Sequence, residues 1–185
     1  MRTEAELVQD CLKGNRAAER ELFERYAGRM AALCRRYTNS PDDAQDLLQE
    51  GFIRVYAKLN TWQGGSLEGW MRKIFIHNCL NAYQSRQRRL ALIEHQTEAQ
   101  DDVALHEGFY DFLATEALLA AINSLPEGAR VIFNLFAIEG YAHTEIAQML
   151  NLSEGACRSQ LTRARKLLQD RLGLKNLASP TTHQP

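Results

Sequence analysis

The sequence predicts an all-α protein: two small helical domains joined by a flexible acidic linker. Three observations favour this fold class. Apolar residues recur at three- and four-residue spacings over most of the 185 residues, and no segment shows the alternation typical of a strand. Hydrophobic residues make up 45% of the chain, which is enough to form a core. An acidic segment without sustained periodicity separates two basic segments.

The formal net charge of −1 hides this uneven distribution of charge. Residues 70–89 carry five basic side chains and no acidic one, whereas residues 90–129 carry eight acidic side chains and no Lys or Arg. Residues 153–171 are basic again, with five basic side chains against Glu154 and Asp170. The pattern indicates two anion-binding surfaces separated by a solvated connector.

Residues 1–90 form the predicted N-terminal domain, and helix start and stop signals divide it. Thr3-Glu4-Ala5-Glu6 is a capping box that opens a helix ending at Gly14. Asn15 caps a second helix, in which six apolar residues recur at helical spacing: Leu22, Phe23, Tyr26, Met30, Leu33 and Cys34.

Ser40, followed by Pro41 and two aspartates, starts a third helix that runs to about Leu59. Its expected apolar stripe is Leu47, Leu48, Phe52, Val55, Tyr56 and Leu59. Gly64-Gly65 interrupts the helical pattern, and Ser66 begins a long helix that continues to the basic residues 86–89.

The remaining boundaries follow from composition and periodicity. Residues 91–111 are predicted to be the linker, 112–175 the C-terminal domain, and 176–185 a disordered tail. In the C-terminal domain, one helix begins near Phe112 and ends before Leu125-Pro126. Another spans about 127–139 and is stopped by Gly140; its expected buried residues are Val131, Ile132, Leu135, Phe136 and Ile138.

The segment from His143 to Leu161 has the pattern of a helix-turn-helix. Ala147 is small where the two helices must cross, and Asn151 lies in the turn, where a left-handed residue is needed. Ser153 caps the second helix, and Cys157 and Leu161 face inward. The candidate DNA contacts are Thr144, Arg158, Ser159, Gln160, Thr162, Arg163, Arg165 and Lys166. The alternative is a solvated amphipathic helix with surplus charge.

Other classes of site have little support in the sequence. The cysteines Cys11, Cys34, Cys79 and Cys157 form no CxxC pair, which favours core packing over a disulfide framework or a zinc site. The carboxylates of Asp42, Asp43, Asp46 and Glu50 are a conceivable metal or acid–base site, but capping explains the first two and no histidine lies nearby. We therefore predict no catalytic residue, no metal and no cofactor. With no apolar leader or bilayer-length apolar stretch, we expect a cytoplasmic protein without membrane insertion.

Several stretches of the chain carry a family resemblance. Residues 46–59, from Asp46-Leu47-Leu48-Gln49-Glu50 to Lys58-Leu59, resemble the polymerase-binding helix of the sigma-70 family. Residues 66–78 resemble the promoter-melting helix that follows it. Leu125-Pro126-Glu127, Gly140-Tyr141 and residues 161–168 resemble the family's C-terminal domain. The resemblance covers about Leu7 to Leu172 and is closest to the small extracytoplasmic-function (ECF) sigma factors.

The resemblance implies a sigma region 2 bundle over 1–90, a region 4 helix-turn-helix over 112–175, and roles for their residues. The partners would be core RNA polymerase, through its β′ clamp and β flap, promoter DNA and an anti-sigma factor. The implied polymerase contacts are Asp46, Gln49, Glu50, Phe52 and Arg54. The implied −10 element contacts are Trp70, Arg72, Lys73, His77, Asn78, Arg86, Arg88 and Arg89. The helix-turn-helix residues named above would contact the −35 element, and the protein would be a transcription initiation factor rather than an enzyme.

Some questions stay open at this level. Leu67 stands where the family usually has an aromatic residue, and His77-Asn78 replaces a more usual Asn followed by a small residue. Either His77 or Asn78 could therefore read a flipped base. Trp70 fits core packing as well as base stacking, because it lies at helical spacing with Ile74. An ordinary helix-turn-helix regulator would explain residues 143–161 but would leave the basic segment 70–89 unexplained. An enzyme would need a convergent nucleophile or metal set.

Overall fold

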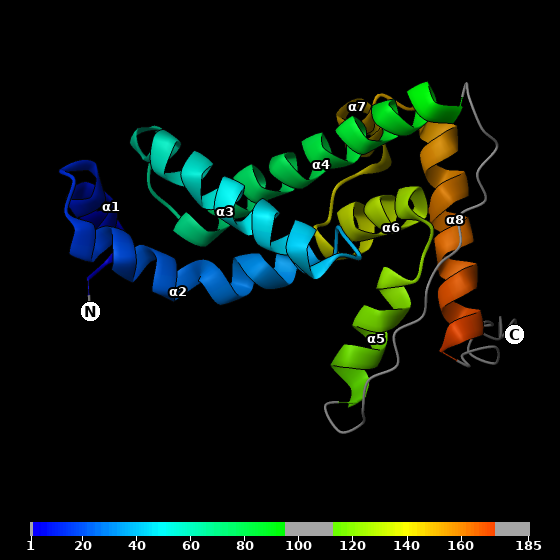
Figure 1. The fold of residues 1–185 in the computed structure, drawn as a ribbon, viewed down its shortest axis with the longest axis horizontal. Helices are drawn as coiled ribbons and strands as arrows, with labels where there is room; N and C mark the ends of the chain where they lie inside the picture. The colour runs from blue at the N-terminus through cyan, green and yellow to red at the C-terminus, as the bar shows by residue number, and fades with distance from the viewer. Residues whose placement is uncertain (1, 95–112, 173–185) are drawn as a thin grey trace, which may run out of the picture. The chain divides into compact units, whose positions relative to one another are not determined.

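The computed structural model describes residues 2–94 and 113–172 (Figure 1). These residues form helices and connecting turns, and none of them forms a strand. The chain divides into two compact units, Met1–Asp101 and Asp102–Pro185. The prediction of an all-α fold with two helical domains is thus confirmed. Only 91–94 of the predicted linker are described, where they continue the last helix of unit 1, and the predicted tail lies outside the described residues.

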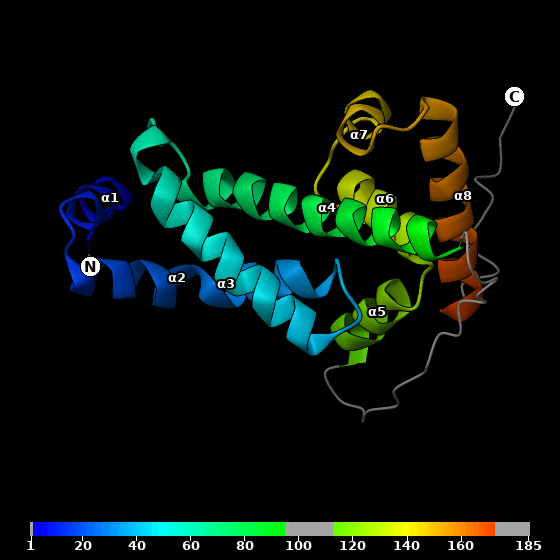
Figure 2. The ribbon, with the colours of Figure 1, turned by 45° about the horizontal axis from the view of Figure 1, so that its top comes forward.

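Unit 1 is built on three long helices. Its elements are α1 (Glu4–Leu12), α2 (Arg16–Arg35), α3 (Pro41–Lys58), the 3₁₀ turn η1 (Leu59–Thr61) and α4 (Leu67–Glu94). In Figures 1 and 2, α3 crosses both α2 and α4, against which it packs. The helix α1 packs on α2. One face of α3 is therefore covered from two sides, and its other face is left for solvent or a partner.

The predicted helix starts are formed as expected. The Thr3 side chain accepts from the Glu6 N–H, and the Glu6 carboxylate accepts from the Thr3 N–H at 2.8 Å. The Asn15 side chain accepts from two N–H groups of α2, and Ser40 Oγ accepts from the Asp43 N–H at 3.2 Å. Each acceptor satisfies N–H groups that the first turn leaves unpaired, which stabilises a helix by about 1 kcal/mol.

An aromatic cluster fills the space between α2, α3 and α4. The Phe52 ring lies 4.7 Å from Phe23, 6.2 Å from Tyr56 and 5.4 Å from Phe75, measured between ring centroids. Phe75 is fully buried, whereas Phe23 is 42% exposed. Phe23 therefore covers the edge of the cluster and leaves one side of its ring in solvent.

The cysteines of unit 1 are buried thiols, as predicted. Burial raises the pKa of Cys11 to about 11. A hydrogen bond with Cys34, together with burial, raises the pKa of Cys79 well above its usual value. Thiols with raised pKa values stay protonated and react slowly, which suits a packing role.

A carboxylate of α1 connects three helices of unit 1. Glu4 accepts from the Tyr26 hydroxyl of α2 at 2.8 Å and from the Leu67 N–H at 2.9 Å. Leu67 is the first residue of α4, so this carboxylate faces the positive end of that helix. Leu67 itself is fully buried. The start of the basic helix is therefore held in place by residues far away in sequence.

Tyr26 should make the stability of unit 1 depend on pH in the alkaline range. Burial, and then the bond to Glu4, raise the pKa of Tyr26 from 10.0 to about 12. Because the folded state binds this proton more tightly, the stabilisation is complete below about pH 10 and is lost as pH rises toward 12. Urea unfolding between about pH 9 and 12 should show a smaller loss of stability in Tyr26→Phe than in the natural protein. Equal losses would contradict this role.

Unit 2 is organised around its last helix. Its elements are α5 (Leu113–Asn123), α6 (Glu127–Phe133), the π-helical turn η2 (Asn134–Ile138), α7 (His143–Leu150) and α8 (Glu154–Arg171). The helix α8 packs against α5, α6 and α7. One buried cluster consists of Ala121, Ile122, Leu125, Ala129, Ala164 and Leu168. Among the described residues of both units, no helix has the length and apolar character that crossing a membrane requires.

The helix expected over 127–139 changes its winding after Phe133. The Glu139 N–H donates to the Asn134 carbonyl at 3.0 Å, an i→i+5 bond that widens the turn. The 3.6-residue spacing does not extend through such a turn. Phe136 is therefore only half-buried and Ile138 is 38% exposed, so the prediction that both are core residues is wrong. Val131, Ile132 and Leu135 are buried, as predicted.

Candidate functional site

The helices α7 and α8 form the predicted helix-turn-helix. Asn151 ends α7 in the left-handed conformation, with φ 54° and ψ 48°. The Leu152 N–H donates to the Ala147 carbonyl at 2.9 Å, which closes the turn. Ser153 Oγ then accepts from the Ala156 N–H at 3.1 Å and caps α8. The predicted inward residues Cys157 and Leu161 are buried.

Asn151 should be replaceable by glycine but not by valine. Glycine adopts a positive φ without strain, whereas a left-handed conformation destabilises a residue with a Cβ by about 1–2 kcal/mol, and a branched Cβ is worse than most. We expect Asn151→Gly to unfold like the natural protein and Asn151→Val to lose about 1–2 kcal/mol. Hydrogen exchange of the α7 and α8 amides would measure this difference. Equal protection in the two variants would exclude a requirement for the left-handed turn.

The outer face of α8 carries the candidate DNA contacts. Ser159, Arg163 and Lys166 lie opposite the buried stripe of the helix and are exposed. Arg158 pairs with the Glu154 carboxylate at 2.9 Å, and the Thr162 hydroxyl donates to the Arg158 carbonyl at 3.0 Å. The remaining candidates are Gln160, half-buried, and Thr144 and Arg165, both exposed. Hydroxyl, guanidinium and ammonium groups on one helix face suit base edges and phosphates.

A second candidate surface lies along α4. With 3.6 residues per turn, Trp70, Lys73, His77 and Arg88 share one side of the helix. Trp70 is half-buried and the other three are exposed. Arg72 and Arg86 are half-buried and point elsewhere, and Arg89 is exposed. An aromatic ring among cations suits single-stranded nucleic acid, which combines stacked bases with phosphates.

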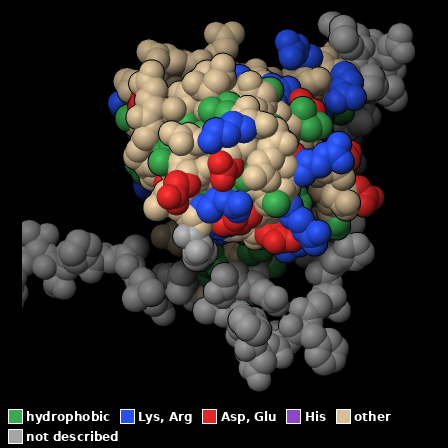
Figure 3. Space-filling view, turned by 90° about the vertical axis from the view of Figure 1, so that its left-hand side faces the viewer, with side chains coloured by type: hydrophobic (Ala, Val, Ile, Leu, Met, Phe, Trp, Pro, Cys, Tyr) green, Lys and Arg blue, Asp and Glu red, His purple; other side chains and the backbone are tan. Residues whose placement is uncertain are grey.

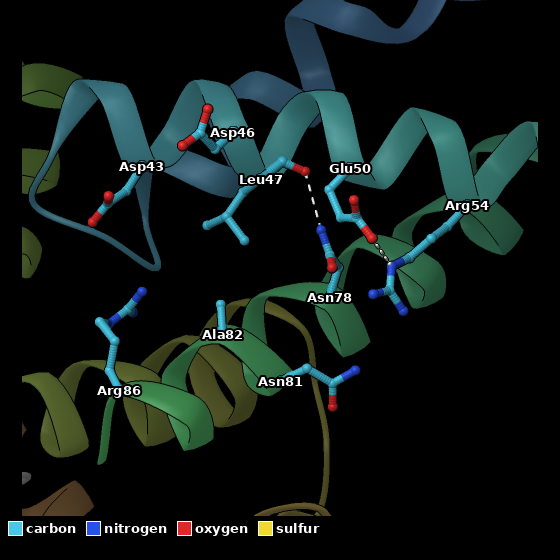
Figure 4. Close-up of a pocket in the computed structure, with 9 residues that line it drawn as sticks. All are labelled: Asp43, Asp46, Leu47, Glu50, Arg54, Asn78, Asn81, Ala82 and Arg86. Carbon is cyan, nitrogen blue, oxygen red and sulfur yellow. Dashed lines mark hydrogen bonds and ion pairs between the residues drawn. The ribbon is translucent and has the colours of Figure 1, made fainter. Parts of the chain in front are cut away.

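His77 and Asn78 have different environments. Asn78 is 5% exposed, and its Nδ2 donates to the Leu47 carbonyl of α3 at 3.2 Å (Figure 4). His77 is exposed. The buried Asn78 therefore serves to join α3 to α4, and the assignment of Asn78 as a DNA contact is corrected.

An acid-rich groove runs between α3 and α4. Figure 4 shows the residues that line it, which are Asp43, Asp46, Leu47, Glu50, Arg54, Asn78, Asn81, Ala82 and Arg86. Glu50 pairs with Arg54 at 2.9 Å, and Asp43 accepts from the Thr38 hydroxyl at 3.3 Å. Within the residues that the structure describes, no three His, Cys, Asp or Glu side chains gather as metal ligands. The carboxylates of this groove are thus arranged as an open surface.

The predicted polymerase contacts divide into two groups. Asp46, Gln49 and Glu50 are exposed, and Arg54 is half-buried beside the groove. Phe52 is 3% exposed and belongs to the aromatic cluster, so its assignment as a contact is corrected. Phe52 packs beneath the exposed residues of α3 and contacts Phe75 of α4.

The predicted polymerase contacts do not include Ile53, although this residue is 62% exposed and lies on the same side of α3 as Glu50 and Gln49. The signal was an apolar residue three and four positions after exposed polar ones. Figure 3 shows a different surface, at the α1 end of unit 1, where basic and acidic side chains are intermixed. In the same unit, Arg2 forms ion pairs with Asp10 and Glu21. Along α3, the carboxylates of Asp43, Asp46 and Glu50 line one groove together with Arg54 and Arg86.

Comparison with known proteins identifies both units. The Sigma-70 region 2 family matches residues 22–89, and the Sigma-70, region 4 family matches residues 115–168. The chain is 32% identical over 155 residues to the ECF RNA polymerase sigma factor SigE of Mycolicibacterium smegmatis. This match covers 82% of this chain and 60% of the length of that protein. It is 27% identical over 181 residues to the ECF RNA polymerase sigma-E factor of Haemophilus influenzae, covering 92% and 95% of the two chains.

A solved structure has the same fold. The sigma factor RpoE from Bartonella quintana, in complex with the anti-sigma factor NepR, superimposes with a TM-score of 0.56 at 22% identity, covering 85% of this chain and 98% of that chain. The region 2 match lies within unit 1 and the region 4 match within unit 2. The chain therefore belongs to the sigma-70 family of RNA polymerase sigma factors, as a member of its extracytoplasmic-function subfamily.

Proposed function

We propose that this chain binds core RNA polymerase in the cytoplasm and directs transcription initiation at specific promoters, with no covalent chemistry of its own. The observation that carries the proposal is the segregation of charge on unit 1. The exposed carboxylates of Asp46 and Glu50 line the groove between α3 and α4, which Arg86 of α4 also lines, whereas Lys73 and Arg88 lie along another side of α4. Such a unit suits two partners of opposite charge, a basic protein surface and a nucleic acid.

In this proposal, α4 opens the −10 element. Extracting a base from the stack requires a few kcal/mol. Stacking of that base on an aromatic ring returns about 1–3 kcal/mol. Trp70 offers such a ring, His77 offers a hydrogen-bonding group about two helical turns further along α4, and Lys73 and Arg88 offer phosphate contacts. The neutral Asn78 takes no part in reading bases and instead keeps α4 against α3.

The helix-turn-helix would dock on the duplex of the −35 element. The outer face of α8, with Ser159, Arg163 and Lys166, enters the major groove, and Thr144 at the start of α7 contacts the backbone. The polymerase partners would be the β′ clamp, at the acid-rich groove of unit 1, and the β flap, at unit 2. A partner of the anti-sigma class, like the one bound to the Bartonella protein, is a further proposal.

Run-off transcription with purified core polymerase on a promoter library tests the function directly. We expect transcripts from a subset of templates that share two sequence elements, and none from core polymerase without this chain. A simple repressor would instead bind duplex DNA tightly without polymerase and would start no transcripts. That second result would overturn the proposal.

A further inference from the structure

Three side chains of unit 2 form a stack at the edge of the helix-turn-helix. The rings of Phe136 and His143 lie 4.5 Å apart, centroid to centroid, and are inclined by only 16°. The guanidinium carbon of Arg165 lies over the Phe136 ring, 5.5 Å from its centroid. The three residues come from η2, α7 and α8, so the stack joins all three elements.

The backbone between the two rings explains why they meet. Gly140 has a φ of 80°, and the Tyr141 N–H donates to the Leu135 carbonyl at 3.0 Å, so the chain turns back after η2. Leu135 and Asn134 are fully buried and fix the π turn from inside. Phe136, the next residue, is therefore held at the boundary between core and solvent, with His143 against it.

Arg165 differs in its pairing from Arg158, the other arginine near that edge of α8. The charge of Arg158 is compensated by Glu154 at 2.9 Å. Arg165 is exposed, and no carboxylate within the described part of the chain pairs with it. An aromatic face attracts a guanidinium without occupying its N–H donors, which stay directed outward in its plane. A ring can thus orient this arginine while leaving its charge and donors for an anion.

We propose that Phe136 is a positioning residue for DNA binding, whose ring, held by His143, orients the Arg165 guanidinium toward a phosphate of the duplex. This inference rests on the proposed function of α8. A long side chain loses rotamer freedom when it contacts a phosphate, and an arginine that is already oriented loses less. Phe136 would touch no DNA and would act entirely through Arg165.

The test uses the full chain assembled with core polymerase, bound to a promoter fragment at several salt concentrations. We expect Arg165→Gln to make the fall of log affinity with log salt less steep, by about 0.9 in slope. It should also weaken binding about fivefold near 0.15 M salt. Phe136→Leu should weaken binding in the same direction by a smaller factor. Phe136→Tyr retains the ring and should bind as the natural protein does.

Double variants separate positioning from a loss of packing. Because Phe136 acts through Arg165, Phe136→Leu should add nothing in the Arg165→Gln background. It should have its full effect in the background of Lys166→Gln, which removes an exposed cation of the same helix. Equal effects in both backgrounds, or failure of Phe136→Tyr to restore binding, would overturn the inference.

Two other outcomes are distinguishable. If Arg165→Gln leaves affinity and salt slope unchanged while the natural holoenzyme still initiates transcription, the inference fails and the proposed function stands. If the natural chain supports neither promoter binding nor initiation, the proposed function itself fails.

Discussion

Replacing Gly51 with alanine should destabilise unit 1 by about 1–3 kcal/mol. A Cβ at this position of α3 would lie 2.1 Å from Cε1 and 2.5 Å from Cζ of the Phe75 ring. Phe75 is fully buried and packs edge-on against Phe52, with 78° between the ring planes, so it cannot move aside. The better helix propensity of alanine opposes this loss by about 1 kcal/mol and is too small to offset a steric overlap of this depth.

Tryptophan fluorescence during urea unfolding would measure the effect. The chain has two tryptophans, and both, Trp62 and Trp70, lie in unit 1, so the signal follows that unit. The matched control is Gly28→Ala in α2, where nothing lies within 4 Å of the added Cβ. That variant should gain about 0.5–1 kcal/mol. Similar changes in stability for the two variants would contradict the close approach of α3 to Phe75.

Reversing the charges of Asp46 and Glu50 should weaken binding to core polymerase about tenfold or more. Both carboxylates line the groove between α3 and α4 and are exposed, so a basic partner surface would meet repulsion in place of attraction. Loss of Glu50 also removes the partner of Arg54, 2.9 Å away, and leaves a further positive charge at the same place. The core of unit 1 is untouched, and its fluorescence-detected unfolding should change little.

Titration of labelled core polymerase with Asp46→Lys/Glu50→Lys, and with the neutral Asp46→Asn/Glu50→Gln, would test this order of effects. The control is Glu24→Lys in α2, because Glu24 is also exposed and also pairs with an arginine four residues away, Arg20 at 2.8 Å. It should bind as the natural chain does. If the charge-reversed chain kept its affinity, polymerase would have to dock on another surface.

Local chemistry explains which features could be read from the sequence. Caps at Thr3, Ser40 and Ser153 depend on side chains within three residues of the N–H groups that they satisfy, and the left-handed Asn151 depends on one residue. Such features need no knowledge of the neighbouring helices. The acid-rich face of α3 could be predicted for the same reason, since helical spacing alone separates its polar residues from its apolar ones.

The departures from the sequence predictions come from contacts between elements and, in unit 2, from a local change of helical winding. Asn78 is polar and was expected at the surface, but a carbonyl on α3 provides a partner that no local pattern reveals. Spacing places Phe52 correctly in the buried stripe of α3, and only the family resemblance implied that it is a polymerase contact. Spacing alone cannot show that Phe23 lies at the edge of the aromatic cluster. The π turn displaced Phe136 and Ile138 from their expected positions because the 3.6-residue rule assumes uniform winding. The stack of His143, Phe136 and Arg165 depends on that turn and could therefore not be predicted from the sequence.

The hydrogen bond between Asn78 and the Leu47 carbonyl also sets the distance between the polymerase-facing side of α3 and the DNA-facing side of α4 in the proposed function. It fixes α4 to α3 one residue after His77, so the distance from the α3 face to the side of α4 that carries Trp70 and His77 is set by packed helices rather than by a loop. Under the proposed function, unit 1 would act as a spacer of constant length between the polymerase and the DNA. Once α3 is docked on the polymerase, the point at which the strands separate would be fixed relative to the catalytic centre, and transcripts would begin at a constant distance from the −10 element.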